Sequence, residues 1–321
     1  GTQTYNGGLN TASVDGTVTV NGTLATSNDA VVLGAVTLGS ATAIDTNATN
    51  TTGDITIGAV TGGSQNLTFT TEDNITGANI TASGAISNVG ALTLNSVGGT
   101  ATFSGDVDAE SLTVDNTVAN VAFTGNGSTV TNSFTPNNDG TLTLGTSGGT
   151  QTYNGGLNTA STDGTVTLNG SLVTSNDALT VGAVTLGSNT ILTSAGGAIV
   201  TGAIIGTSSE DLTITSSGGG TNTVVTNGAI GASDNINTIA ITGATSVSLG
   251  GNISTNDASG NTVTVTGSTL DTNGITIDTN NTNNDGNITA NVNTFPDAVT
   301  IDAGGAVMQM TPITTNAVIE G

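Results

Sequence analysis

Apolar and polar residues alternate along most of this chain in short runs of four or five residues. Residues 17–20 (TVTV), 66–70 (NLTFT) and 262–265 (TVTV) are representative. A period of two with many β-branched residues predicts a strand that buries one face. Asn-Gly pairs such as Asn126-Gly127 separate the runs, and both residue types accept the backbone conformations of tight corners. The pattern therefore predicts many short strands joined by tight turns.

Other fold classes fit this pattern less well. No apolar period of 3.6 residues persists, and Lys and Arg, both good helix formers, are absent. An immunoglobulin-like sandwich or a closed barrel would also contain many short strands, but usually with aromatic core residues, which are only 2% here. Disorder is a further alternative because the net charge is −23. The patterned apolar residues and the presence of only three prolines argue against disorder.

The chain also repeats itself. Residues 1–40 recur at 149–188 without gaps, at an offset of 148, and all but seven positions are identical. A fainter copy relates 44–56 to 277–289, at an offset of 233. Dividing these offsets by 7 and by 11 gives about 21 in both cases, which is a typical coil length of a solenoid. The sequence therefore predicts an all-β fold, a parallel β-solenoid with coils of about 21 residues.

We expect this solenoid to run through residues 1–321 as one continuous domain. Residues 306–321 contain both methionines and a proline, which indicates a carboxyl-terminal junction or cap. Because the sequence does not begin with Met, we interpret it as a processed piece or fragment of a longer protein.

The differences between the two long copies predict which side chains face inward. Val20 and Leu168 exchange one aliphatic residue for another, as a packed interior tolerates, so both should point inward. Tyr5 and Tyr153 should share an environment, except for end effects at the first coil. Three pairs differ in polarity or size, and we expect their side chains to be exposed to solvent: Val14/Thr162, Ala25/Val173 and Val32/Thr180.

The composition excludes several classes of function. Lys, Arg, His and Cys are all absent, so the chain has no imidazole base, thiolate, Schiff-base amine or guanidinium group. We therefore expect no enzyme activity and no cofactor. Binding to nucleic acid needs cationic side chains against the phosphates, so we expect no nucleic-acid partner. No apolar run approaches the ~20 residues that span a bilayer, so no membrane span is expected.

The block GTQTYNG, the phrase VTLG at 36–39 and 184–187, and the repeated Leu-Thr-Val or Leu-Thr-Ile strands also carry a resemblance. They resemble bacterial filamentous-haemagglutinin-type exoproteins and autotransporter passengers. The resemblance covers most of the chain and implies a right-handed parallel β-helix that is secreted and presented at the cell surface. The secretion domain and charged loops that this family often carries are not found here.

Acidic residues are the only candidates for chemistry. Asp106, Asp108 and Glu110 alternate and would share one face of a strand, with Asp115 following. Three aligned carboxylates could bind calcium, although a charged, solvated strand edge explains them better. The pair Glu210-Asp211 could be imagined as the acid and base of a glycosidase, but neighbours on a strand point to opposite faces.

These observations favour a structural role outside the cell, at the cell surface. We expect a secreted fibre or filament subunit that joins copies of itself end to end, because terminal coils expose unpaired strand edges. Divalent cations are expected to relieve the repulsion among 23 carboxylates. The alternative is an adhesin passenger that binds a host or surface receptor. Thr-x-Thr triplets suit ice binding, a minor alternative because their spacing along the chain is too irregular for one continuous array.

Overall fold

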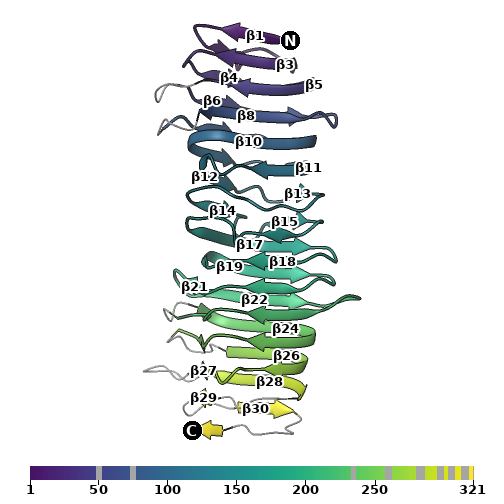
Figure 1. Ribbon diagram of the computed structural model, residues 1–321, viewed down its shortest axis with the longest axis vertical. Helices are drawn as coiled ribbons and strands as arrows, with labels where there is room; N and C mark the ends of the chain where they lie inside the picture. Colours follow the sequence, from purple (N-terminus) through teal and green to yellow (C-terminus); the bar gives the residue numbers. More distant parts are fainter. Residues whose placement is uncertain are drawn as a thin grey trace. The chain divides into compact units, whose positions relative to one another are not determined.

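The computed structural model shows a β-solenoid (Figure 1). It describes residues 1–47, 53–72, 77–232, 236–256, 262–279, 286–294, 300–302, 308–311 and 318–320. Throughout these residues the regular secondary structure is β-strand, without a helix, and the strands pair in parallel. They stack in about 12 coils that follow one another at about 22 residues. The alternating pattern and the internal repeats therefore predicted the fold class correctly.

Contacts divide the chain into two units. The first comprises Gly1–Gly155 with Ser161–Val166, and the second Gly156–Ala160 with Thr167–Gly321. One continuous domain over 1–321 stays a prediction, and the expected junction at 306–321 lies largely outside the described residues. The strands of the first unit are β1 (Thr2–Tyr5), β2 (Leu9–Asn10), β3 (Val18–Thr26), β4 (Val31–Leu33), β5 (Val36–Asp45), β6 (Ile55–Ile57), β7 (Val60–Thr61), β8 (Leu67–Glu72), β9 (Ile80–Ala82), β10 (Ile86–Phe103), β11 (Val107–Val114), β12 (Val118–Phe123), β13 (Thr129–Val130), β14 (Leu142–Leu144) and β15 (Thr150–Tyr153).

The second unit contains the remaining strands, except that Val166 of β17 belongs to the first. They are β16 (Leu157–Asn158), β17 (Val166–Thr174), β18 (Leu179–Val181), β19 (Val184–Ser194), β20 (Ile199–Thr201), β21 (Ile204–Gly206), β22 (Glu210–Ser216), β23 (Thr223–Thr226), β24 (Ile236–Leu249), β25 (Ile253–Ser254), β26 (Thr262–Asp271), β27 (Thr276–Asp278), β28 (Asn287–Thr294), β29 (Thr300–Asp302), β30 (Met308–Thr311) and β31 (Val318–Glu320).

Inward-facing residues stay in register from coil to coil although the coils differ in length. Leu94 pairs with Val114 in a short coil of the first unit, whereas Ile214 pairs with Ile241 in a longer coil of the second. All four side chains are buried. The additional residues of the longer coil include the exposed loop 217–221. Loops therefore absorb the variation in coil length, and the buried columns keep their spacing.

Asparagine side chains connect the corners of successive coils. The Asn66 Oδ1 atom accepts a hydrogen bond of 2.9 Å from the Ala91 N–H group, and Asn120 Oδ1 accepts one of 2.9 Å from Thr141. A Cβ atom on Gly90, next to Ala91, would lie 2.7 Å from Asn66 Oδ1, so only glycine fits beneath that amide. This arrangement explains why Asn and Gly are so abundant at the corners.

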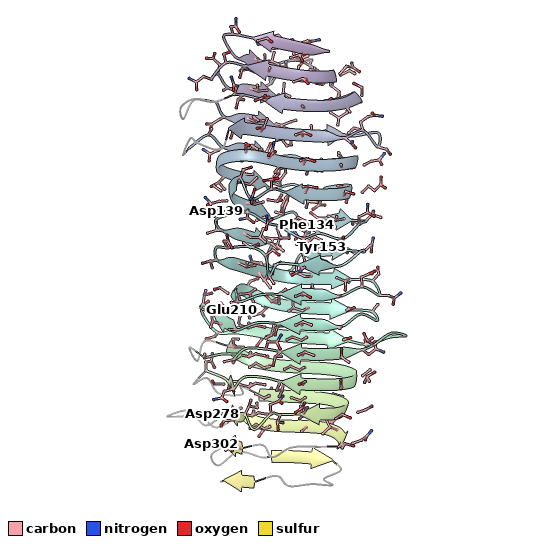
Figure 2. The ribbon with its side chains drawn as sticks, viewed as in Figure 1. Phe134, Asp139, Tyr153, Glu210, Asp278 and Asp302 are labelled. Atoms are coloured by element: carbon pink, nitrogen blue, oxygen red, sulfur yellow. The ribbon has the colours of Figure 1, made fainter. Side chains whose placement is uncertain are left out.

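Five of the seven aromatic side chains form one buried stack inside the first unit. The ring centroids are 6.2, 4.9, 6.1 and 5.7 Å apart along the series Phe69, Phe103, Phe123, Phe134 and Tyr153. Figure 2 labels the last two rings, which lie side by side at an interplanar angle of 16°. Aromatic residues are too few for a large globular core, and the fold concentrates them in one narrow interior.

Candidate functional site

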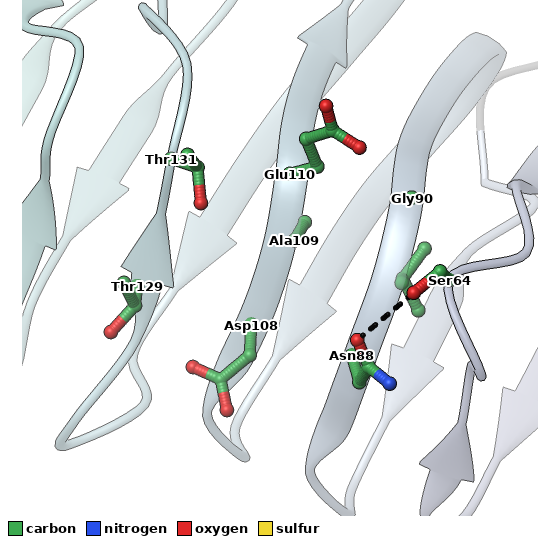
Figure 3. Close-up of a pocket in the computed structure, with 9 residues that line it drawn as sticks. Ser64, Asn88, Gly90, Asp108, Ala109, Glu110, Thr129 and Thr131 are labelled. Atoms are coloured by element: carbon green, nitrogen blue, oxygen red, sulfur yellow. Dashed lines mark hydrogen bonds between the residues drawn. The ribbon is translucent and has the colours of Figure 1, made fainter.

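The acidic residues singled out in the sequence lie on the outer surface around β11. Asp108 and Glu110 share the outward face of this strand, as the alternation predicted, and Asp106 directly precedes it. Figure 3 shows Asp108 and Glu110 together with Thr129 and Thr131 in a depression of about 450 Å³. Ser64 and Asn88 lie at its other side and are joined by a hydrogen bond of 3.3 Å.

The three carboxylates have different surroundings. Asp106 does not line the depression, and its Oδ1 atom accepts a hydrogen bond of 2.7 Å from the Gly127 N–H group. Partial burial and the charge of Asp106 raise the pKa of Asp108, against the effect of a hydrogen bond from the Thr129 backbone. Across the described ranges, no three acidic side chains gather closely enough to hold a metal ion. The calcium site at Asp106, Asp108 and Glu110 stays a prediction.

Glu210 occupies a corner of the second unit as a buried, fully hydrogen-bonded carboxylate (Figure 2). The Thr207 hydroxyl donates to its Oε1 atom over 2.6 Å, and the Ser208 N–H group donates to Oε1 and Oε2 over 2.9 and 3.0 Å. Burial alone would raise the pKa of Glu210, but the hydrogen bonds from Thr207, Ser208 and its own backbone lower it to about 2.

The neighbouring Asp211 points to the opposite face of β22. Its side chain is half-buried, and its Oδ1 atom accepts a hydrogen bond of 2.7 Å from the Thr238 hydroxyl. Glu210 and Asp211 therefore do not share one site, as their adjacent positions on a strand predicted. Glu210 instead accepts hydrogen bonds from Thr207 and Ser208 at a corner of the second unit.

Residues 1–20 form the first described coil, which we call the head coil. Among the described strands, its strand β1 pairs with β3 alone. The Gln3 side chain is exposed and the Tyr5 side chain is half-buried. A cavity of about 190 Å³ reaches from these two residues to Leu9, Val18 and Leu24.

The same sequence is closed at its second occurrence. We call the contacts of residues 149–155 with residues 123–134 the internal junction. Gln151 is 0% exposed, and its Nε2 atom donates to the backbone oxygens of Phe123 and Gly125 over 2.8 and 3.3 Å. Tyr153 is 2% exposed, stacks on Phe134 and donates a hydrogen bond of 2.9 Å to Gln151 Oε1. Burial raises the pKa of the Tyr153 phenol.

Backbone hydrogen bonds complete the internal junction. The N–H groups of three alternate residues, Thr150, Thr152 and Asn154, donate to the backbone oxygens of Asn126, Ser128 and Val130 over 2.7, 2.8 and 2.8 Å. In the head coil, the corresponding strand β1 pairs among the described strands with β3 alone. Tyr5 and Tyr153 consequently differ in burial, which is the end effect expected at a first coil.

Sequence reasoning did not identify the side chains whose surroundings differ between the two copies. The signal was available in the duplication, since Gln3 and Tyr5 recur unchanged at positions 151 and 153. The sequence alone could not show that Gln151 and Tyr153 are buried, because their burial depends on contacts with residues 123–134 of the preceding coil.

Comparison with known proteins finds no matching family model, no matching curated protein and no matching solved structure. The described residues contain no helix of the length and apolar character needed to cross a membrane. The site itself must therefore support any functional conclusion.

Proposed function

We propose that the chain is a structural subunit of a secreted surface fibre or stalk and that its copies join end to end. The observation that carries the proposal is that, among the described strands, the outermost ones are paired on one side only. β1 pairs with β3, β30 with β28, and β31 with β29, all in parallel. An unpaired strand edge is a template for another strand, and a head-to-tail contact that does not close on itself builds a filament.

Charge opposes this assembly. Each molecule carries 23 carboxylates and no Lys, Arg or His. Exposed carboxylates on adjoining coils repel one another, and salt screens this repulsion beyond ~8 Å at physiological ionic strength. Assembly should therefore strengthen with salt, with calcium, and at a pH of about 4.5, where many carboxylates take up protons.

The test is sedimentation and negative-stain electron microscopy of the full chain over a range of concentration, salt, calcium and pH. Filaments one solenoid wide that lengthen with salt or calcium would support the proposal. A chain that stays monodisperse under all these conditions would contradict it. Binding of such a monomer to a surface target would favour the adhesin instead.

One observation favours ice binding as a second candidate. Outward threonines that are irregularly spaced in the sequence come into register in the second unit. Thr215 pairs with Thr242, and Thr242 pairs in turn with Thr266, although the two sequence intervals differ. Thr264 pairs with Thr289 in the adjacent column. Successive strands lie ≈ 4.8 Å apart, so these hydroxyls form two columns of regular spacing.

Ice recrystallisation in the presence of the chain tests this candidate. Thr242→Gln would disturb the array at its centre, whereas Thr102→Gln changes an outward threonine of the first unit, outside the array. If the second unit binds ice, the wild type and Thr102→Gln inhibit recrystallisation and Thr242→Gln does not. Equal behaviour of all three proteins would exclude the array as an ice-binding surface.

A further inference from the structure

Asn-Gly pairs form several corners of the solenoid, and this dipeptide carries a chemistry of its own. The backbone nitrogen of the glycine, once it gives up its proton, can attack the side-chain Cγ atom of the asparagine. A bond from Cγ to the backbone nitrogen forms, the bond from Cγ to the amide nitrogen breaks, and ammonia leaves with the glycine proton. Water then opens the resulting succinimide ring to aspartate or isoaspartate. A hydrogen bond that holds the glycine N–H group therefore opposes this deamidation.

The Asp106 carboxylate holds one of these glycine N–H groups. Gly127 donates to Asp106 Oδ1 over 2.7 Å, from the coil that follows Asp106. The bond engages the proton whose loss would start the reaction at Asn126, and the negative charge of Asp106 disfavours an anion on the Gly127 nitrogen. A carboxylate is also far too weak a base to remove a proton from a backbone amide. Asp106 therefore protects Asn126.

Serine hydroxyls make the same contact in both copies of the duplicated block. The Gly22 N–H group donates to Ser40 Oγ over 3.2 Å. The Gly170 N–H group donates to Ser188 Oγ over 3.3 Å. The two contacts are related by the offset of 148 residues between the copies. The arrangement is thus a repeated property of this corner.

The corner at Asn227-Gly228 differs from these three. The Asn227 side chain is exposed, and among the described residues neither its amide nor the Gly228 N–H group has a hydrogen-bond partner. The backbone on both sides is nevertheless held by hydrogen bonds. The Asn227 N–H group donates to the Thr201 oxygen over 2.7 Å, and the Ala229 oxygen accepts a bond of 2.9 Å from Ile204. The two reacting groups are therefore free within an ordered corner.

We propose that Asn227 is a site of spontaneous deamidation in the folded chain, with water as the only co-reactant. Asn21, Asn126 and Asn169 are protected by the hydrogen bonds that hold the N–H groups of the glycines after them. The reaction needs no catalytic side chain, so a chain without Lys, Arg, His or Cys can undergo it. The inference concerns the chemistry of a single chain and does not depend on end-to-end assembly.

The modification would change the second unit in two ways. Aspartate at position 227 adds a carboxylate to a chain whose net charge is already −23. Isoaspartate lengthens the main chain by one carbon atom between Thr226 and Ile230, both of which are 0% exposed. Ile230 pairs with Ile204 in the preceding coil and with Ile253 in the following one. The extra atom would therefore disturb the stacking of these coils.

The test is mass spectrometry of peptic fragments after incubation of the full chain at mildly alkaline pH, once folded and once in urea. Pepsin is used because trypsin finds no Lys or Arg to cleave after. The ratio of the unfolded to the folded rate measures how strongly the fold protects each asparagine. We expect this ratio to be about tenfold smaller at Asn227 than at Asn126, whose glycine is held by a charged acceptor. An equal or larger ratio at Asn227 would overturn the proposal.

Substitutions of the acceptors test the cause of the protection. Asp106→Ala should accelerate deamidation of Asn126 about tenfold, and Asp106→Asn, which keeps an acceptor oxygen, should restore part of the protection. A variant that simply unfolds would accelerate every Asn-Gly pair together, so a rise confined to Asn126 supports the proposal. An unchanged or slower reaction at Asn126 in Asp106→Ala would contradict it.

The duplicated block supplies a control within one molecule. Ser188→Ala removes the acceptor of Gly170 and leaves Ser40 in place. We expect about threefold faster deamidation of Asn169, since a neutral hydrogen bond is lost, and no change at Asn21. Equal rates at Asn169 before and after the substitution would show that the hydroxyl does not protect it.

Discussion

The two copies of the duplicated block have nearly the same sequence and different surroundings. In the first copy Gln3 is exposed and Tyr5 half-buried, whereas in the second Gln151 and Tyr153 are 0% and 2% exposed. The inward-facing apolar positions further along the two copies agree. Val20 and Leu168, further along each copy, are 5% and 0% exposed, which confirms that both point inward.

Local sequence and neighbouring coils therefore determine different properties. The tyrosine hydroxyl donates to the glutamine two residues before it in both copies, over 2.8 Å in the first and 2.9 Å in the second. Burial, by contrast, depends on the coil stacked in front. This is the behaviour of a quasi-one-dimensional fold, in which each coil contacts only its neighbours.

Truncation of the two tyrosines should give the largest contrast. Tyr153→Ala removes a ring that is packed against Phe134, and we expect a loss of about 3–5 kcal/mol of unfolding free energy. Tyr5→Ala should cost less than about 1 kcal/mol under conditions where the chain is a monomer. Urea unfolding followed by circular dichroism measures both values. Equal losses would show that the first coil is already closed in the monomer.

Replacing the two glutamines should also cost more unfolding free energy in the second copy than in the first, but with a smaller difference between the copies than for the tyrosines. Gln151→Ala leaves the backbone oxygens of Phe123 and Gly125 and the Tyr153 hydroxyl without their partner inside the fold. We expect this to cost about 3 kcal/mol, because unsatisfied buried polar groups retain their full desolvation penalty. Gln3→Ala should change stability by less than about 0.5 kcal/mol. A Gln151→Ala protein as stable as the wild type would mean that water replaces the amide.

Much of the fold could be predicted because its determinants are local and repeated. Alternation along 17–20 and 262–265 predicted strands, and the duplicated block predicted stacked coils of nearly the right length. Positions such as Val32 and Thr180, whose exchange changes polarity, are half-exposed as expected. The variation in coil length could not be predicted, since exposed loops such as 217–221 absorb it without any change in the apolar pattern.

The candidate site was less predictable because it depends on contacts between coils. The aromatic stack joins Phe69, Phe103 and Phe123 at irregular sequence intervals, so no period reveals it. Alternation correctly placed Asp108 and Glu110 on one face, but it could not show that the Asp106 carboxylate is engaged by Gly127. The depression beside them also needs β13, a strand of only two residues.

Glu210 extends the comparison to a polar group outside the duplicated block. Because the pKa of Glu210 is lowered from 4.5 to about 2 in the fold, its stabilisation is complete above pH 4.5 and is lost as the pH falls toward 2. The full effect corresponds to roughly 3 kcal/mol. We expect Glu210→Gln to lose roughly 2 kcal/mol at neutral pH, since the amide retains only one acceptor oxygen.

The contribution of the Glu210 carboxylate can be measured from the unfolding free energies of wild type and Glu210→Gln between pH 7 and pH 2. The stability difference between wild type and Glu210→Gln should shrink below pH 4.5. Glu110→Gln is the matched control for the loss of one carboxylate, because Glu110 is exposed on β11. A constant difference between wild type and Glu210→Gln over this range would mean that folding does not lower the pKa of Glu210.

The smallest effect is expected where the two copies differ at the surface. Val32→Thr and Thr180→Val give each copy the residue of the other, and both positions are half-exposed on short parallel strands. Each variant should stay within about 0.5 kcal/mol of the wild type, because both residues are β-branched and neither leaves the solvent-facing side. Leu33→Thr, at the adjacent inward position that is 2% exposed, should instead cost about 2 kcal/mol or more. Urea unfolding of the three variants compares them. If Val32→Thr were as costly as Leu33→Thr, the outer face at Val32 would have to be covered, and the assignment of inward and outward positions from the duplicated block would be wrong there.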